Sequence, residues 1–251
     1  MERYRSLRKG TPTAAFFAVC LVCLWPSHRG FADLSAAPLR QAGSSGWRFV
    51  LENKYLSYEV KLREGEDAEV TIVNKSLKEK YVLPSPVFMV MTEDRLANIA
   101  RSKIHRVRAS GSGEEVQTAL IVAACPRAGL AVSALYELEE NAFFVKKRLA
   151  ISRLEAGETL VKRIDVDVVR VPDGKEVVEF SGLGQPIYYR DLFFGVEYPA
   201  CTLLHNERGR IRLGYEYGLP VGLSTTRSHA AVIGVAPDGN VGKSFMKYVK
   251  T

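Results

Sequence analysis

The stretch LSYEVKLREGEDAEVTI, residues 56–72, decides the fold class of this chain. Apolar side chains occupy every second position from Leu56 to Leu62 and again from Ala68 to Ile72, with polar side chains between them. An acidic turn that contains Gly65 separates the two runs. Because alternate side chains of a strand point to opposite faces, residues 55–73 are predicted to form a β-hairpin with one buried face.

The same period of two recurs along the rest of the chain. Polar separators, or separators that contain Gly and Pro, bound the further runs. We expect strands at residues 116–123, 130–138, 142–151, 159–170 and within 229–239. The run at 159–170 alternates cleanly and is expected to be half-buried, whereas residues 92–100 are the one internal segment where a helix is predicted. Many short strands without alternating helices predict an all-β sandwich or barrel.

The C-terminus departs from this pattern. In KSFMKYVKT, residues 243–251, the side chains of Phe245, Tyr248 and Val249 recur at helical spacing. Two turns of helix are marginal in isolation, so this apolar face needs a surface to pack on. We therefore expect the sandwich over residues 47–242, and over 243–251 the start of a helix or linker toward a following domain absent from this chain.

Residues 1–32 have the features of a secretory signal peptide. A basic leader precedes an apolar run from Ala14 to Trp25, which is shorter than the ~20 residues that span a bilayer. Cleavage is expected before Asp33, and residues 33–46, rich in Ala, Gly and Ser, are expected to form a flexible N-terminal arm. The mature chain is expected to be secreted or periplasmic, with no stable membrane anchor after cleavage.

The charge of the chain argues against nucleic acid as a partner. The formal net charge is +7, from 35 basic and 28 acidic residues. Five of these basic residues and one acidic residue lie within residues 1–32, so the remaining chain carries only +3. No block of Lys and Arg with interleaved aromatic residues occurs elsewhere in the sequence.

Cys125 and Cys201 are the two cysteines that follow the predicted leader. One disulfide and two buried thiols are both compatible with an exported chain. Neither cysteine lies in a spacing typical of zinc ligands, so we predict no metal site and no cofactor. Asn74-Lys75-Ser76 is an N-glycosylation sequon that has meaning in a eukaryotic secretory host.

The candidate binding segment is SGLGQPIYYRDLFFGVEYPA, residues 181–200, which concentrates aromatic, glycine and charged residues. Phe193 and Phe194 are expected to fill the core or a domain seam. The candidate ligand-binding residues offer ring faces, a cation and two carboxylates: Tyr188, Tyr189, Arg190, Asp191 and Glu197. The alternative for the charged residues is a surface ion pair beside a packed ring.

We further expect this segment to form an edge of the fold, because of the Gly and Pro residues at 182–186. Its inward residues, Phe193 and Phe194, would then anchor it. Tyr189, Asp191 and Glu197 would face a cleft or a neighbouring domain. No catalytic residue is assigned.

The order of these features resembles a known family. The motifs are the opening hairpin, LAVSALYELEENAFFVKKRLAISRLEAGETLVKRIDVDVV at 130–169, GQPIYYRDLFFGVEYPA at 184–200 and FMKYV at 245–249. Together, over residues 47–251, they resemble the N-terminal β-supersandwich of secreted glycoside hydrolases of the α-galactosidase (melibiase) type. The resemblance implies a large antiparallel supersandwich of the galactose-mutarotase-like kind. It also implies that the catalytic carboxylates belong to a (β/α)8 barrel, of ~250 residues, for which this chain has no room.

Three functions remain open from the sequence. The first is a non-catalytic, carbohydrate-associated N-terminal module of a glycoside hydrolase-like protein, or a truncated remnant of one, with an oligo- or polysaccharide and a missing C-terminal barrel domain as partners. The second is a small stand-alone enzyme of the epimerase or polysaccharide lyase type that uses residues 181–217. For that second function, none of His105, His205 and His229 has an acidic neighbour at a telling spacing. The third is a purely structural secreted β-protein.

Overall fold

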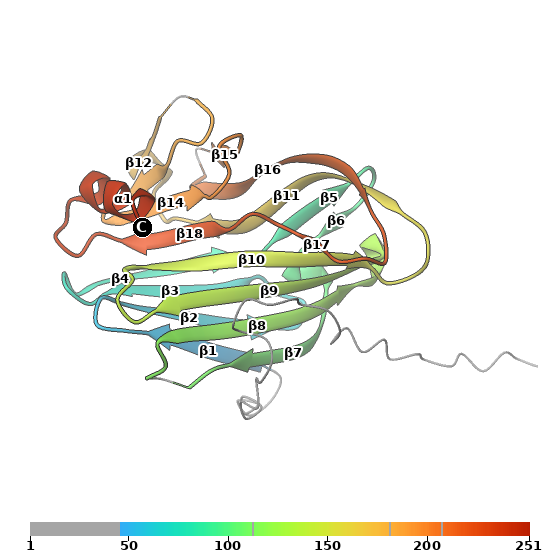
Figure 1. Ribbon diagram of the computed structural model, residues 1–251, viewed down its shortest axis with the longest axis horizontal. Coiled ribbons are helices and arrows are strands. Elements are labelled where there is room, and N and C mark those ends of the chain that lie inside the picture. Colours follow the sequence, from blue (N-terminus) through green and yellow to red (C-terminus); the bar gives the residue numbers. More distant parts are fainter. Residues whose placement is uncertain (1–45, 112, 181, 207) are drawn as a thin grey trace, which may run out of the picture. The chain divides into compact units, whose positions relative to one another are not determined.

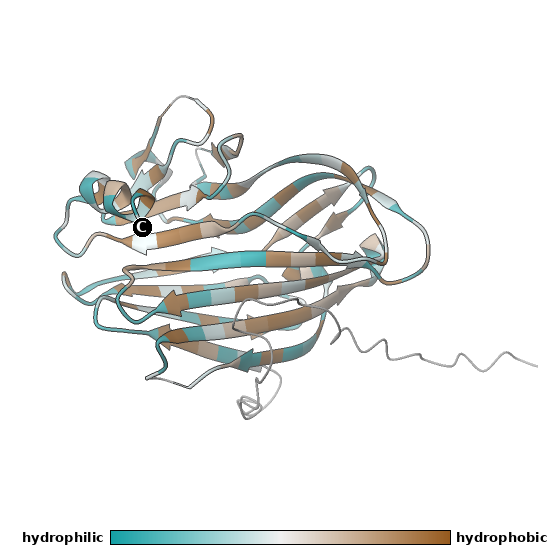
Figure 2. Cartoon of the chain, viewed as in Figure 1, coloured by the Kyte–Doolittle hydropathy of each residue, from teal (hydrophilic) through white to brown (hydrophobic). Residues whose placement is uncertain are grey.

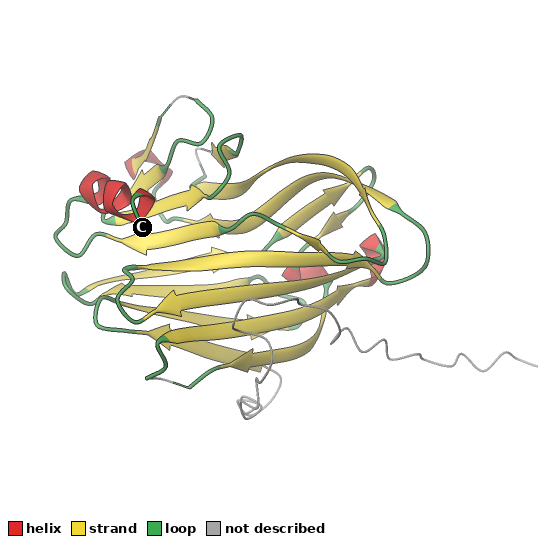
Figure 3. Cartoon of the chain, in the orientation of Figure 1, coloured by secondary structure: helices red, strands yellow, loops and turns green. Residues whose placement is uncertain are grey.

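The computed structural model describes residues 46–251 with the exception of 112, 181 and 207. The predicted signal peptide, 1–32, and the predicted arm, 33–46, lie outside the described residues, apart from Gly46. The described chain is all-β, with large antiparallel sheets and one short C-terminal α-helix (Figures 1 and 3). The predicted fold class is therefore confirmed.

A four-stranded antiparallel sheet contains the opening hairpin. Its strands, in spatial order, are β1 (Gly46–Glu52), β2 (Leu56–Arg63), β3 (Ala68–Asn74) and β4 (Glu79–Ser85). Strands β2 and β3 are the predicted hairpin, and Tyr58 lies opposite Ile72 in their register. The alternate residues Tyr58, Val60 and Leu62 are all buried, so the apolar face predicted from the period of two is the core face.

A nine-stranded sheet forms the second layer. In spatial order its strands are β12 (Val177–Glu179), β13 (Ile187–Tyr189), β14 (Leu192–Val196), β18 (Ala231–Val235), β10 (Phe144–Arg153), β9 (Leu130–Glu139), β8 (Val116–Cys125) and β7 (Lys103–Ala109), with β17 (Thr226–Arg227) paired to β10. Four of the predicted strands lie here. Figure 2 shows both hydrophobic and hydrophilic residues along β7 to β10. Buried residues alternate with more exposed ones along much of β8 and β9, as expected for strands with one face in the core.

A five-stranded sheet completes the sandwich. Its order is β15 (Thr202–His205), β16 (Arg210–Val221), β11 (Thr159–Arg170), β5 (Met89–Thr92) and β6 (Leu96–Ala97). Strand β11 has the predicted bounds, but the expectation that it is half-buried was wrong, because residues 163–169 are all buried. Its polar residues are satisfied inside the protein: Asp165 accepts from Arg163 and Arg212, and Asp167 pairs with Lys147.

The helix predicted for residues 92–100 is not present. Strand β5 ends at Thr92, β6 follows, and the only helical turn there is the short 3-10 helix η1 (Ile99–Arg101). The Thr92 hydroxyl accepts a hydrogen bond from the Arg95 backbone at 3.0 Å. Side-chain to backbone hydrogen bonds of this kind favour a turn over a helix, so residues 92–95 form a turn in place of the first turn of the predicted helix.

Contacts between aromatic rings join the first two layers. The Tyr136 ring of β9 lies 5.1 Å from Phe49 of β1 and 5.9 Å from Tyr58 of β2, measured between ring centroids.

Lys147 of β10 and Asp167 of β11 form a buried ion pair with 3.1 Å between Nζ and Oδ1, which joins the nine-stranded and five-stranded sheets. Desolvation raises the pKa of Asp167 and lowers that of Lys147, and their mutual attraction opposes both effects.

The C-terminal helix α1 (Val241–Val249) packs back onto the nine-stranded sheet (Figure 1). The Asn240 side chain caps it by accepting from the Lys243 backbone at 2.9 Å. The Phe245 and Tyr248 rings lie 5.8 and 5.9 Å from the Phe193 ring of β14. The surface that this helix needs is therefore supplied by the sandwich itself. No helix within the described residues is both long enough and apolar enough to cross a membrane.

Candidate functional site

The candidate segment forms a β-hairpin within the nine-stranded sheet. Strand β13 pairs with β12 on one side and β14 on the other, so the expectation that the segment is an edge was wrong; β12 ends the sheet. Gly184 precedes the hairpin with φ +73°, and a Cβ there would approach the Pro199 carbonyl oxygen to 2.9 Å. This close approach and backbone conformation explain the glycine.

The hairpin residues alternate between two buried faces. Tyr189 points inward, where its ring meets the Tyr81 ring at a centroid distance of 6.0 Å. Tyr188 and Phe193, which are opposite each other in register, point to the outer face and pack beneath Phe245 of α1. The Phe193 ring also fills the space above Gly234 of β18, where a Cβ would have no room.

Phe193 and Phe194 are both fully buried, as predicted, but on opposite sides of the sheet. Phe194 belongs to the sandwich core, whereas Phe193 anchors α1.

Asp191 is a buried structural carboxylate. It accepts hydrogen bonds from the Tyr81 hydroxyl and from Asn74 Nδ2, and the same Asn74 amide donates to the Ala236 carbonyl at 2.9 Å. Burial, and then the bond to Asp191, raise the pKa of Tyr81. Tyr189 and Asp191 were expected to face a cleft or a neighbouring domain. This was wrong for both residues. Tyr189 is buried against Tyr81, and the Asp191 carboxylate is satisfied by partners inside the fold.

This network makes a glycan on the Asn74 sequon incompatible with the fold. The Asn74 side chain is fully buried, and its amide nitrogen is engaged by two acceptors. In the folded state it is not accessible to a glycosyl transfer enzyme.

Arg190 forms a surface ion pair, the alternative considered from the sequence. Its guanidinium donates to both carboxylate oxygens of Glu176, in the 3-10 helix η3 (Gly174–Glu176), at 2.5 and 3.1 Å. This pairing lowers the pKa of Glu176. Both side chains are largely exposed, and exposed ion pairs contribute little to stability.

Glu197 is the predicted residue that does reach the surface beside other polar groups. Its carboxylate lies 2.9 Å from Lys146 Nζ, 3.5 Å from Arg148 Nη2 and 3.3 Å from the Tyr248 hydroxyl. Arg148 also pairs with Glu137. Burial, and then the Glu197 carboxylate, raise the pKa of Tyr248. The Glu197 side chain remains 32% exposed, so it stays accessible to a ligand.

A stacked pair of rings is formed by the chain neighbours of Glu197 and Ala230. The Glu197 backbone N–H donates to the Ala230 carbonyl at 2.8 Å, which brings the adjacent His229 alongside. The His229 ring stacks on Tyr198 at 4.2 Å with 8° between the planes, and His229 is exposed. The edge of Tyr215 supports both rings.

We name this area the Glu197–His229 surface, defined by Lys146, Arg148, Glu197, Tyr198, His229 and Tyr248. The sequence identified Glu197 as a candidate, but not its cationic partners, and it gave His229 no role. The signal available in the sequence was the alternation of β10, which places Lys146 and Arg148 on one face and the buried Lys147 on the other.

The described residues contain no group of three or more His, Cys, Asp or Glu side chains suited to a metal ion. Cys125 and Cys201 are both buried free thiols, which decides between the two alternatives left open. His205 lies 4.0 Å from Glu179, between Nδ1 and Oε2.

Comparison by sequence finds no matching family model and no matching curated protein. Comparison by structure does find similar folds. The α-galactosidase from Lactobacillus brevis matches with a TM-score of 0.52 and 12% identity, over 75% of this chain and 39% of its own. The GH36 α-galactosidase AgaB from Geobacillus stearothermophilus matches with a TM-score of 0.54 and 10% identity, over 76% and 40%.

The fold also occurs in a protein with a different name. An α-mannosidase from Enterococcus faecalis matches with a TM-score of 0.51 and 8% identity, over 84% of this chain and 31% of its own. This chain thus spans well under half the length of each solved structure. At such low identity the likeness establishes the fold, which is that of a β-sandwich portion found within GH36 α-galactosidase structures.

Proposed function

We propose that this chain is a secreted, carbohydrate-associated β-sandwich that serves as the N-terminal module of a glycoside hydrolase-like protein and does not cleave glycosidic bonds alone. The observation that carries the proposal is the shared fold, which matches only a portion, about 40%, of each of the two α-galactosidases. We take a domain that carries the catalytic carboxylates as its partner.

The Glu197–His229 surface is the proposed place of glycan contact. Aromatic rings can stack on the C–H face of a sugar, and the exposed His229 ring is already held flat against Tyr198. Glu197, whose backbone bonds to Ala230 next to His229, forms ion pairs with Lys146 and Arg148, and these three side chains offer an acceptor and two donors for sugar hydroxyls. A few polar groups placed beside a ring are the usual composition of a small-ligand site.

A stand-alone enzyme that uses residues 181–217 receives less support. Tyr188, Tyr189 and Asp191 are held in packing or hydrogen bonds within the fold. Arg190 pairs with Glu176 at the surface. Glu197 is then the one predicted residue of the segment that contributes to an accessible site.

A glycan-array screen of the purified chain, followed by calorimetry with the best-binding neutral oligosaccharide, tests the proposal. We expect binding, and we expect His229→Ala and Glu197→Gln each to weaken it about tenfold, the loss of one good contact. Lys80→Gln, an exposed change on β4, is the control that should leave affinity unchanged. Failure of every glycan to bind would refute the proposal.

Hydrolysis provides the second arm of the test. Glycosidases need two carboxylates that flank the scissile bond, and we place that pair on the partner domain. We therefore expect no turnover of an aryl α-galactoside by the purified chain. Turnover that is lost on changing a carboxylate of this chain, such as Glu197→Gln, would overturn the non-catalytic assignment.

A further inference from the structure

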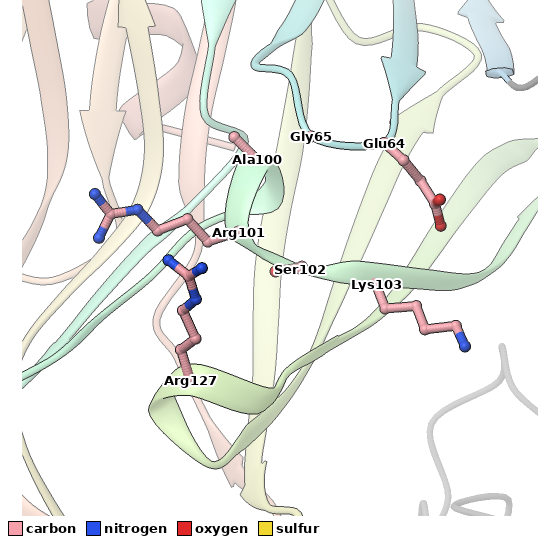
Figure 4. Close-up of a pocket in the computed structure, with 7 residues that line it drawn as sticks. All are labelled: Glu64, Gly65, Ala100, Arg101, Ser102, Lys103 and Arg127. Atoms are coloured by element: carbon pink, nitrogen blue, oxygen red, sulfur yellow. The ribbon is translucent and has the colours of Figure 1, made fainter.

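A hollow with three cationic residues and one acidic residue in its lining lies at the end of the sandwich away from α1. Strand β3 runs from this end, beside the turn at Gly65, to Asn74, whose side chain contacts Ala236 just before α1. The hollow has a volume of about 410 Å³. Its lining residues are Glu64, Gly65, Ala100, Arg101, Ser102, Lys103 and Arg127 (Figure 4).

A buried contact holds together the two backbone segments that carry Arg101 and Arg127. Ser102 Oγ lies 2.9 Å from Cys125 Sγ and donates to the Asn98 carbonyl at 2.5 Å. Arg101 directly precedes Ser102, and Arg127 follows Cys125 by two residues. The contact therefore ties η1 to the end of β8 and sets the spacing between the two arginines.

Local structure adds to this rigidity. In η1 the Asn98 side chain accepts from the Arg101 backbone N–H at 3.1 Å. Arg127 lies in the 3-10 helix η2 (Pro126–Ala128), which begins with a proline and ends at Gly129 with φ +64°. Both arginine side chains extend from these turns and are exposed. Figure 4 shows the Arg127 side chain directed toward Arg101, whereas Lys103 and Glu64 point to the other side.

The pairing of charges distinguishes these two arginines from others. Many arginines pair with carboxylates of the described residues, among them Arg48, Arg63, Arg95, Arg148, Arg163, Arg190 and Arg212. Within the described part of the chain, neither Arg101 nor Arg127 forms such a pair. Two guanidinium groups that line one hollow without a paired carboxylate repel each other. An anion bound between them would attract both, which makes the net electrostatic interaction favourable.

We propose that Arg101 and Arg127 bind an oxyanion carried by a sugar, the sulfate ester or the carboxylate of an acidic glycan. The planar fork of a guanidinium matches both groups with two parallel hydrogen bonds. The oxyanion chemistry rests on the arginines alone. The glycan as its source rests on the proposed function, since a free inorganic anion presents the same group.

The experiment is calorimetric titration of the purified chain, at low ionic strength, with three probes: a sulfated disaccharide, a uronate disaccharide and inorganic sulfate. We expect at least one acidic disaccharide to bind more tightly than inorganic sulfate. Arg101→Gln and Arg127→Gln should each weaken that binding about tenfold. Glu64→Gln removes the acidic residue of the lining and should strengthen binding about twofold. Raising the salt concentration should weaken it.

The control is Lys80→Gln, which removes the same charge from an exposed position near the other end of the sandwich. It should leave affinity unchanged, and all variants should keep the melting temperature of the parent. No binding of any probe, or binding that Arg101→Gln and Arg127→Gln do not weaken, overturns the site. Binding of inorganic sulfate alone overturns the acidic glycan.

Binding of a neutral glycan by the Arg101→Gln variant tests the acidic-sugar site separately from the proposed function. The Arg101→Gln variant should bind a neutral glycan as the parent does, because that glycan is placed at the Glu197–His229 surface. Loss of neutral-glycan binding in Arg101→Gln would show that the two sites are not separate, and it would overturn the assignment of the hollow to acidic sugars.

Discussion

Replacement of Asp191 by alanine should destabilise this protein far more than replacement of Glu197, although both belong to one short segment of sequence. Asp191 is 7% exposed and accepts hydrogen bonds from two buried donors, Tyr81 and Asn74. Glu197 is 32% exposed in its side chain, and water can replace its partners. The comparison separates a structural carboxylate from a surface one.

The magnitude follows from the two hydrogen bonds. A hydrogen bond to a charged group contributes about 1.5–3 kcal/mol, and a buried donor left without an acceptor keeps its desolvation cost. Loss of both bonds in Asp191→Ala should lower the free energy of unfolding by about 3–5 kcal/mol. For a chain of this length the melting temperature should fall by about 6–20 °C. Glu197→Ala should cost about 1 kcal/mol or less.

Urea denaturation of the full chain, followed by tryptophan fluorescence and by circular dichroism, measures both values. Tyr81→Phe, which removes one of the two bonds, adds a double-mutant cycle. We expect the two changes to be non-additive by at least about 0.5 kcal/mol, because they share a hydrogen bond. A loss of under about 1 kcal/mol in Asp191→Ala, or a larger loss in Glu197→Ala than in Asp191→Ala, would refute the structural role of Asp191.

Three further predictions concern the core, the sequon and a thiol. Phe194→Ala should cost about 3–5 kcal/mol in urea denaturation, as is usual for a fully buried Phe; a cost below about 1 kcal/mol would place its ring at the surface. Folded protein from a eukaryotic secretory pathway should carry no glycan on Asn74 in intact-mass analysis, because a glycan on this buried side chain would have no room in the fold; full occupancy by glycan would contradict that burial. Burial raises the pKa of Cys125 to about 11, so the neutral thiol is favoured in the folded state. The contribution of this neutral thiol to the free energy of unfolding should be complete below about pH 8.5, the usual pKa of an unfolded thiol. It should be lost as the pH rises toward 11, because the unfolded thiol ionises there and the folded one does not. Cys125→Ala should flatten that part of the stability profile, and an unchanged profile would refute the assignment.

The strands could be predicted from the sequence because the period of two is a local property. Residues 159–170 were assigned as a strand with the bounds observed. The burial of that strand could not be predicted from the same pattern. Arg163, Asp165 and Asp167 look like a solvent face. Their burial is made favourable by Lys147 of the nine-stranded sheet and by Arg212 of the paired strand β16.

The candidate site shows the same limit. The composition of residues 181–200 indicated that ring and charged residues gather there, and Glu197 does lie at an accessible surface. The faces of Tyr188 and Tyr189 depend on what covers each side of the sheet, which is α1 on one side and Tyr81 on the other. The partners of Glu197 come from about 50 residues away in either direction, at Lys146 and Tyr248. No local pattern in the sequence encodes these pairings.

Contact with carbohydrate is proposed at the Glu197–His229 surface of this β-sandwich. The most direct test is a nuclear magnetic resonance titration of the labelled chain with the neutral oligosaccharide selected by the glycan array. We expect saturable shifts in the resonances of Tyr198, His229 and Glu197, with those of the buried Asp191 network unmoved. Shifts confined to other surfaces, or no saturable shift with any glycan, would contradict the claim.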